Sequence, residues 1–196
     1  MIISTTPPPP EPVAPRGFTL VEVMVAVTLS GFILAGVLTT NLQLMRSGVR
    51  ITQYAEMETQ IHRGLESLGN DLKIARDIVW NNASDITLTI PSSAGTTSQV
   101  TYAWSSSTGN FFRVPGASSA TTAGRLFLIQ NIPPQAGGAA GLTFARFDRD
   151  GNAATTNLAT KRIQVTMMLR RQPQGTAATS ANSVSATFIM RNKPTS

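Results

Sequence analysis

The sequence predicts an α+β protein in which one long N-terminal helix packs on a C-terminal antiparallel β region. Three observations support this fold class. An apolar run fills residues 18–45, and an amphipathic pattern of helical period follows in residues 46–80. Residues 81–196 then change to short runs of β-branched and aromatic residues separated by Gly, Ser, Asn and Pro. These three segments, with residues 1–17 before them, are the expected organisation of the chain.

The first element is the apolar segment 18–45, which contains one acidic residue, Glu22, and no basic residue. At about 1.5 Å per residue it makes a helix of roughly 42 Å, which exceeds the ~30 Å hydrocarbon core of a bilayer. A secretory signal peptide has a small-residue cleavage site after its apolar core. Here the polar residues 1–17 precede the apolar run, and no such site follows it. We therefore expect a single-pass transmembrane helix and, if the chain is cut, a cut before that helix.

Glu22 is the anomaly of this segment, because a carboxylate inside a membrane helix costs a few kcal/mol unless it has a partner. A cut between Gly17 and Phe18 creates a cationic N-terminus one helical turn from Glu22, on the same chain or on a neighbouring one. Such a charge pair would set the stagger between subunits. The alternative is a simple anchor in which Glu22 sits in the headgroup region.

The segment 17–22, of sequence Gly-Phe-Thr-Leu-Val-Glu, and the apolar residues after it resemble the cleavage and methylation motif of type IV pilins and type II secretion pseudopilins. The resemblance implies a pilin-like fold, cleavage between Gly17 and Phe18 by a membrane prepilin peptidase, and N-methylation of Phe18. It also implies that Glu22 aligns subunits in a helical filament. The function it implies is that of a structural minor pilin or pseudopilin of a type II secretion or type IV pilus system.

The same resemblance implies the partners and the location of the chain. The partners are a prepilin peptidase and methyltransferase, other pilins or pseudopilins, and an inner-membrane assembly platform. The location is the bacterial inner membrane, with the N-terminus cytoplasmic and the C-terminal domain periplasmic or extracellular. Charge alone does not fix this orientation, because Arg46 and Arg50 outnumber Arg16. Within the family, residues 68–75 and a two-part β region are similar to J-type minor pseudopilins and W-type minor pilins.

Residues 1–17 are rich in proline, a composition that favours extended conformers and cannot pack a core. We interpret them as a prepilin leader that is removed.

Beyond the apolar segment, apolar residues recur at three- and four-residue steps from Met45 to Leu72. The opposite face is charged, so the apolar stripe needs a cover, which the β region of the same chain can supply. The helix is predicted to continue to Trp80, before the turn residues 81–85. Three glycines are each unfavourable in the helix by up to ~1 kcal/mol relative to alanine and are expected to mark bends: Gly48, Gly64 and Gly69.

Seven candidate strands follow. Their spacing allows a meander of the first three and a second antiparallel layer of the last three. The predicted strands are 86–90, 100–104, 111–114, 125–132, 142–147, 162–170 and 184–190.

The β region is basic, with ten Lys and Arg against three Asp in residues 81–196, a balance of +7. A basic domain attracts nucleic acid or acidic partners, which leaves open an alternative function as the DNA-binding tip subunit of a competence pilus. Residues 111–113 and 144–147 interleave Phe with Arg, as single-stranded nucleic-acid sites do. Because strand alternation sends neighbouring residues to opposite faces, we expect solvated strand edges there instead.

The residues needed for catalysis are scarce. The chain has no cysteine and a single histidine, His62, on the amphipathic helix. Every Ser/His/Asp arrangement would have to use that histidine. We predict that the protein is not an enzyme and needs no cofactor.

One segment resembles the start of a calcium-binding loop, since Asp148, Asp150 and Asn152 surround a glycine. The twelfth position of such a loop is Ala159 instead of a bidentate Glu, and no acid follows Asp150. We therefore predict a turn between two strands and no metal site.

Overall fold

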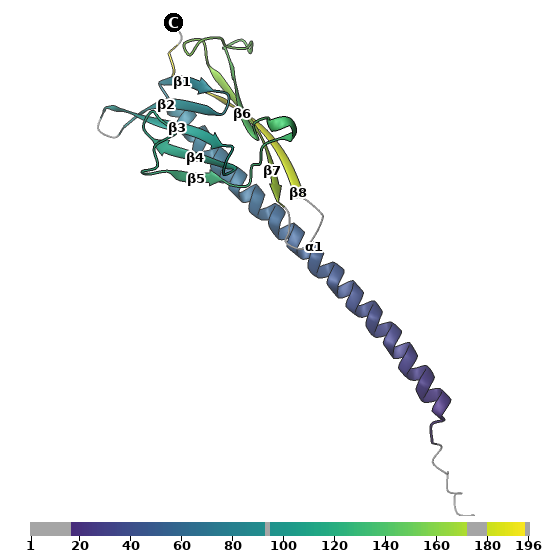
Figure 1. Cartoon of the computed structure of the whole chain (residues 1–196). Helices are drawn as coiled ribbons and strands as arrows, with labels where there is room; N and C mark the ends of the chain where they lie inside the picture. The colour runs from purple at the N-terminus through teal and green to yellow at the C-terminus, as the bar shows by residue number, and fades with distance from the viewer. Residues whose placement is uncertain (1–16, 93–94, 172–179, 195–196) are drawn as a thin grey trace, which may run out of the picture. The chain divides into compact units, whose positions relative to one another are not determined.

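The computed structural model describes residues 17–92, 95–171 and 180–194, and its described part consists of one long helix followed by eight strands (Figure 1). The predicted α+β class is confirmed, because helix α1 (Leu20–Ile74) packs on antiparallel β sheets. Of the expected leader, residues 1–16 lie outside the described residues. The strands are β1 (Asp77–Asn82), β2 (Asp85–Pro91), β3 (Thr97–Ser105), β4 (Asn110–Pro115), β5 (Leu126–Ile129), β6 (Leu142–Phe147), β7 (Arg162–Arg171) and β8 (Ser180–Ile189), with a short 3-10 turn, η1 (Ala136–Gly138), before β6.

The described strands form two antiparallel sheets. The first, called sheet A, takes β1 to β5 in chain order, so that each strand pairs with its neighbours in the sequence. The second, called sheet B, takes β6, β7 and β8 in the same way. All seven predicted strands are present, and the last three form a layer of their own as expected.

The chain divides into two compact units, residues 1–47 and 48–196, and α1 contributes to both. The first unit holds the apolar half of α1. The second holds the amphipathic half of α1 together with sheets A and B.

Within the second unit, α1 buries one face in an apolar core that also takes residues from both sheets. Met57, Ile61, Leu68 and Leu72 are buried there, and full burial of such a side chain contributes about 1.5–3 kcal/mol. The apolar stripe predicted for this helix is therefore confirmed from Met57 onward. Its earlier members are exposed: Met45, Val49 and Tyr54.

The predicted helix end at Trp80 is wrong, because α1 ends at Ile74 and Trp80 lies in β1. The amide of Arg76 leaves the helical pattern and donates to the carbonyl of Thr89 in β2, at 2.8 Å. The residues that follow pair with β2, which is a tertiary interaction that overrides a local helical period. The β-branched residues 78–79 also fit a strand better than a helix.

Two of the three helix glycines lie against side chains of the sheets. A Cβ atom at Gly64 would lie 2.6 Å from Cγ1 of Ile129 in β5, and one at Gly69 would lie 2.7 Å from Cε1 of Phe188 in β8. Real Cβ contacts are longer than this, so only glycine fits without a shift of the neighbour. A Cβ at Gly48 would meet nothing within 4 Å. Helix α1 runs without interruption through all three positions.

A polar bridge ties α1 to sheet A. Oδ2 of Asp71 accepts hydrogen bonds from the hydroxyl of Tyr102, at 2.7 Å, and from Nε of Arg113, at 2.8 Å. The side chains of Asp71 and Arg113 are 15% and 28% exposed, so the ion pair is mostly removed from water. Burial raises the pKa of Tyr102 far above its usual value, which keeps the hydroxyl protonated as a donor.

Replacing Asp71 by alanine is expected to lower the free energy of unfolding by about 2–3 kcal/mol, because the Tyr102 hydroxyl and the Arg113 guanidinium lose their shared acceptor. Chemical denaturation of the purified chain in uncharged detergent measures this loss. Glu66→Ala is the matched control, since it removes an exposed carboxylate from the same helix and should change stability by less than about 0.5 kcal/mol. Equal losses in the two variants would contradict the bridge.

Gly48→Ala and Gly69→Ala are expected to change stability in opposite directions. At Gly48 the added methyl meets no neighbour, so the better helix propensity of alanine stabilises by up to ~1 kcal/mol. At Gly69 the methyl would push on the ring of Phe188, and overpacking of this kind costs about 1–3 kcal/mol. The melting temperatures of the two variants, measured against the unchanged chain, decide the signs. A more stable Gly69→Ala chain would refute the packing role of this glycine.

Candidate functional site

The described part of the first unit is an apolar helix on which nothing packs within the single chain. Every residue from Gly17 to Val49 is exposed. By length and composition this part of α1 can cross a membrane, with a mean hydropathy of 2.2 over its most apolar window. Its large apolar side chains therefore need a cover that other molecules supply. They include Phe18, Leu20, Val21, Met24, Val27, Phe32, Ile33, Leu34, Val37 and Leu38.

The start of this helix is closed by a reciprocal pair of hydrogen bonds between Thr19 and Glu22. The carboxylate Oε2 of Glu22 accepts from the backbone amide of Thr19 at 2.9 Å and from its hydroxyl at 3.0 Å. In return, the hydroxyl oxygen of Thr19 accepts from the amide of Glu22 at 3.3 Å. This is a capping box, with Thr at the N-cap and Glu three positions later. Sequence reasoning missed it, although the Thr-x-x-Glu spacing is visible in the sequence.

The hydroxyl groups of the apolar helix are also satisfied locally. Thr28 donates to the carbonyl of Met24 at 2.7 Å, and Ser30 donates to the carbonyl of Ala26 at 2.7 Å. Thr39 bonds back in the same way to the preceding turn. No hydroxyl among these has to be desolvated without a partner, which is what a medium without water requires.

Glu22 lies on one face of the helix among apolar and small side chains. A shallow surface groove of about 460 Å³ runs along this face, and Glu22 is its one charged lining residue. A partner that covers this face would thus have to be apolar, with a donor or a cation opposite Glu22. The other residues that line the groove are Phe18, Val23, Ala26, Val27 and Ser30.

A comparison with protein families identifies this segment. A family model described as the prokaryotic N-terminal methylation motif matches residues 14–38. The chain carries a prokaryotic N-terminal methylation motif. This motif is typical of type IV pilins and pseudopilins, and it supports placing the chain among them. A search of curated proteins finds no match.

The methylation motif contains the three residues that the sequence marks as functional. Gly17 and Phe18 precede the first helical residue, Leu20, and are exposed. Glu22 stands in the first turn of α1. The structure thus places the predicted cleavage position just before the first helical residue, with the acid in the first turn.

The turn predicted at residues 148–152 is present, and it uses the carboxylate of Asp148. Oδ1 of Asp148 accepts from the amides of Asp150, Gly151 and Asn152 at 2.8–2.9 Å. Desolvation raises the pKa of Asp148, but these hydrogen bonds outweigh it and hold that pKa below its usual value. Gly151 takes a positive φ of 96°, as such a turn requires. In the described chain no group of three His, Cys, Asp or Glu residues is arranged to hold a metal ion.

Three of the four Phe residues that resembled a nucleic-acid site are buried, and one of the two Arg residues belongs to the polar bridge. Phe111, Phe112 and Phe144 are buried, and Arg113 pairs with Asp71. The expectation that these strands are solvated edges is therefore wrong for these side chains. For Phe111 and Phe112 the cause is the strand order, because β4 lies inside sheet A between β3 and β5. Strand β6 is an edge strand of sheet B, and Phe144 is buried there because its side chain belongs to the apolar core.

The single histidine lies on the exposed side of α1, where the sequence places it. Its Nε2 is 3.7 Å from Oε1 of Glu58, one turn earlier, and 76% of its side chain is exposed.

Proposed function

We propose that the chain is a structural minor pilin or pseudopilin, processed between Gly17 and Phe18, methylated on Phe18, and assembled into the helical filament of a type II secretion or type IV pilus system. One observation carries the proposal. The residues matched by the methylation motif begin an apolar helix that is exposed throughout and contains a single charged side chain, Glu22. Proteins with this motif are structural rather than catalytic.

The apolar helix is proposed to occupy two environments, first the membrane and then the filament. Before assembly it spans the inner membrane, where lipid covers its side chains. In the filament, the same side chains pack against the helices of neighbouring subunits, so the apolar surface is covered in both stages. Small residues such as Ala26, Gly31 and Gly36 allow close approach between such helices.

Glu22 is proposed to align each subunit with the next. Processing exposes a cationic amine on Phe18, and a neighbouring amine is the charged partner that an acid in an apolar surrounding needs. The capping box supports this role, because it holds the carboxylate in one place at the start of the helix. In this proposal the N-terminus faces the cytoplasm and the β unit lies in the periplasm or outside the cell.

Gly17→Glu is expected to block processing, since the prepilin peptidase is proposed to require a small residue before the cut. Expression together with a prepilin peptidase, followed by mass spectrometry, should show chains that keep residues 1–17 and lack a methylated Phe18. Gly31→Ala, a change of a second exposed glycine within the same motif, should be processed normally. A Gly17→Glu chain that is cut before Phe18 would refute the assigned site.

Glu22→Gln is expected to leave processing intact but to reduce the incorporation of the subunit into filaments about tenfold or more, because an uncharged group cannot pair with the amine. Quantitative blotting of sheared filaments against total cell protein measures the ratio. Glu66→Gln removes an exposed acid from the same helix outside the methylation motif and should be incorporated normally. Full incorporation of Glu22→Gln would exclude the alignment role, whereas the assignment of the cleavage site would stand.

A further inference from the structure

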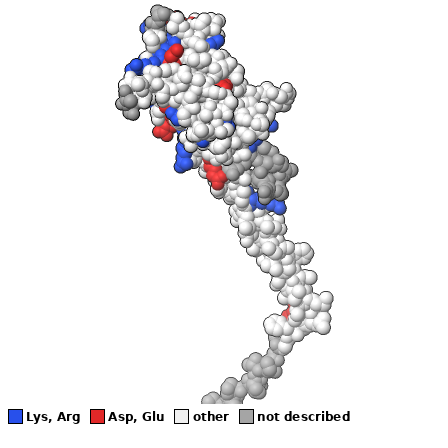
Figure 2. All heavy atoms as spheres, turned by 60° about the vertical axis from the view of Figure 1, so that its left-hand side comes forward, with Lys and Arg blue, Asp and Glu red and all other residues white. Residues whose placement is uncertain are grey.

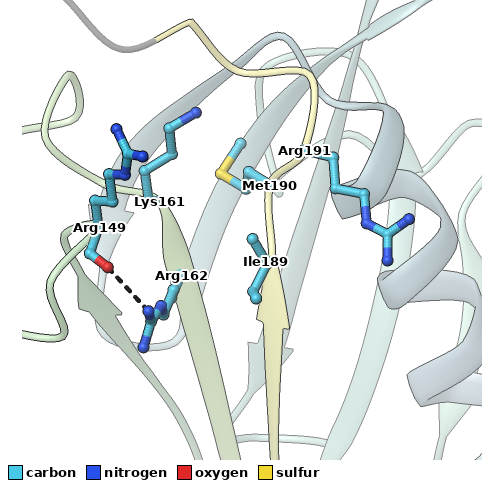
Figure 3. A pocket seen from close by; sticks show the side chains of 6 residues that line it. All are labelled: Arg149, Lys161, Arg162, Ile189, Met190 and Arg191. Atoms are coloured by element: carbon cyan, nitrogen blue, oxygen red, sulfur yellow. Dashed lines mark hydrogen bonds between the residues drawn. The ribbon is translucent and has the colours of Figure 1, made fainter.

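A pocket of about 270 Å³ lies at one end of sheet B and is lined by four basic side chains (Figure 3). The turn after β6 supplies Arg149, and the start of β7 supplies Arg162, with Lys161 just before it. Arg191 follows the end of β8. No acidic side chain lines this pocket, here called the basic pocket. Its apolar lining comes from Ile189 and Met190.

Backbone acceptors hold two of these cations in place. Nη2 of Arg162 donates to the carbonyl of Arg149 at 2.9 Å, and Nζ of Lys161 donates to the carbonyl of Lys193. Figure 3 shows Arg149, Lys161 and Arg162 on one side of Met190 and Arg191 on the other. Because a carbonyl is neutral, these bonds order the side chains and leave their charge uncompensated.

Asp150 follows Arg149 in the turn but does not line the basic pocket, and two further acids are engaged elsewhere. The carboxylate of Asp148 accepts the hydrogen bonds of its own turn, and Asp77 lies 3.7 Å from Nζ of Lys193. In the part of the chain that the structure describes, none of the four pocket cations has a carboxylate within 4.0 Å. Partial burial, and then repulsion by Lys193 and Arg149, lower the pKa of Lys161, as expected in a cationic cluster that lacks a counter-ion.

We propose that the basic pocket binds carboxylate groups of an acidic protein segment. Arginine guanidinium groups present paired donors that match a carboxylate, and the lysine adds a fourth cation to the pocket. The apolar lining fits the aliphatic part of a glutamate or of its neighbour in the segment. The inference goes beyond the proposed function, because binding of this kind does not require filament assembly.

Two features favour a protein segment over nucleic acid. None of the lining residues is aromatic, so the bases of a single strand have no surface on which to stack. The pocket is also small, and a duplex is bound through a row of phosphates along an extended surface. Figure 2 shows Lys and Arg side chains scattered over the second unit, with no continuous basic stripe on that face.

The test uses the purified full chain in uncharged detergent at low salt. A fluorescent Glu-Leu-Glu-Leu-Glu peptide is titrated and its anisotropy recorded, with the Gln-Leu-Gln-Leu-Gln peptide as the uncharged probe. The chain should bind the acidic peptide and not the uncharged one. The double change Arg149→Gln and Arg191→Gln should weaken binding about fivefold or more. In the described chain neither guanidinium group makes a hydrogen bond or an ion pair, so neither change removes a contact that holds the fold.

The matched control is the double change Arg63→Gln and Lys73→Gln, which removes the same charge from exposed positions of α1. It should keep the affinity of the unchanged chain within about twofold. Equal weakening in the two double variants, or weakening in neither, would overturn the proposal.

If the double variant of the pocket shows a lower melting temperature, Arg191→Gln alone is used and should still weaken binding. A thymidine oligonucleotide that binds more tightly than the peptide, and loses affinity in the pocket variant, would assign the pocket to nucleic acid instead.

Discussion

One carboxylate determines how α1 is seated on sheet A. Asp71 receives donors from two adjacent strands, Tyr102 on β3 and Arg113 on β4, through the same oxygen atom. Apolar burial itself is not directional, so these hydrogen bonds add to the close packing a directional constraint against sliding or rotation of the helix. The two hydrogen bonds would both be lost in such a movement. Asp71 thus sets the register of the helix, and Gly64 and Gly69 set its distance from the sheets.

The parts of the fold that follow from local patterns were predictable, and those that depend on pairing were not. The seven strands from β2 onward are recognisable in the sequence as β-branched and aromatic runs between turn residues. Strand β1 is not, because Val79 lies seven residues after Leu72 and so continues the helical spacing, and only pairing with β2 makes this segment a strand. The burial of Phe112 likewise depends on the position of β4 inside sheet A, which no local pattern encodes.

The candidate site was predictable to a similar degree. Gly17, Phe18 and Glu22 stand out in the sequence because polar chain meets a long apolar run at that point. The sequence suggests an acid without a partner, whereas the structure gives Glu22 two hydrogen bonds from Thr19. The basic pocket was beyond prediction, since it joins a turn and two strand ends that lie apart in the sequence. Only the net charge of the region pointed toward it.

In the second unit, sheet side chains lie close against α1 at Gly64 and Gly69. The helix therefore has a buried side, where residue size is restricted, and an exposed side, where it is not. On the buried side, the methyl group of an alanine already collides with Ile129 or Phe188, so residue size there is restricted by both sheets at once. On the other side, residues such as Glu58, Glu66 and Lys73 are exposed, so their charge can change sign without disturbing the core. Related sequences can therefore acquire new recognition surfaces along this helix while their fold is preserved.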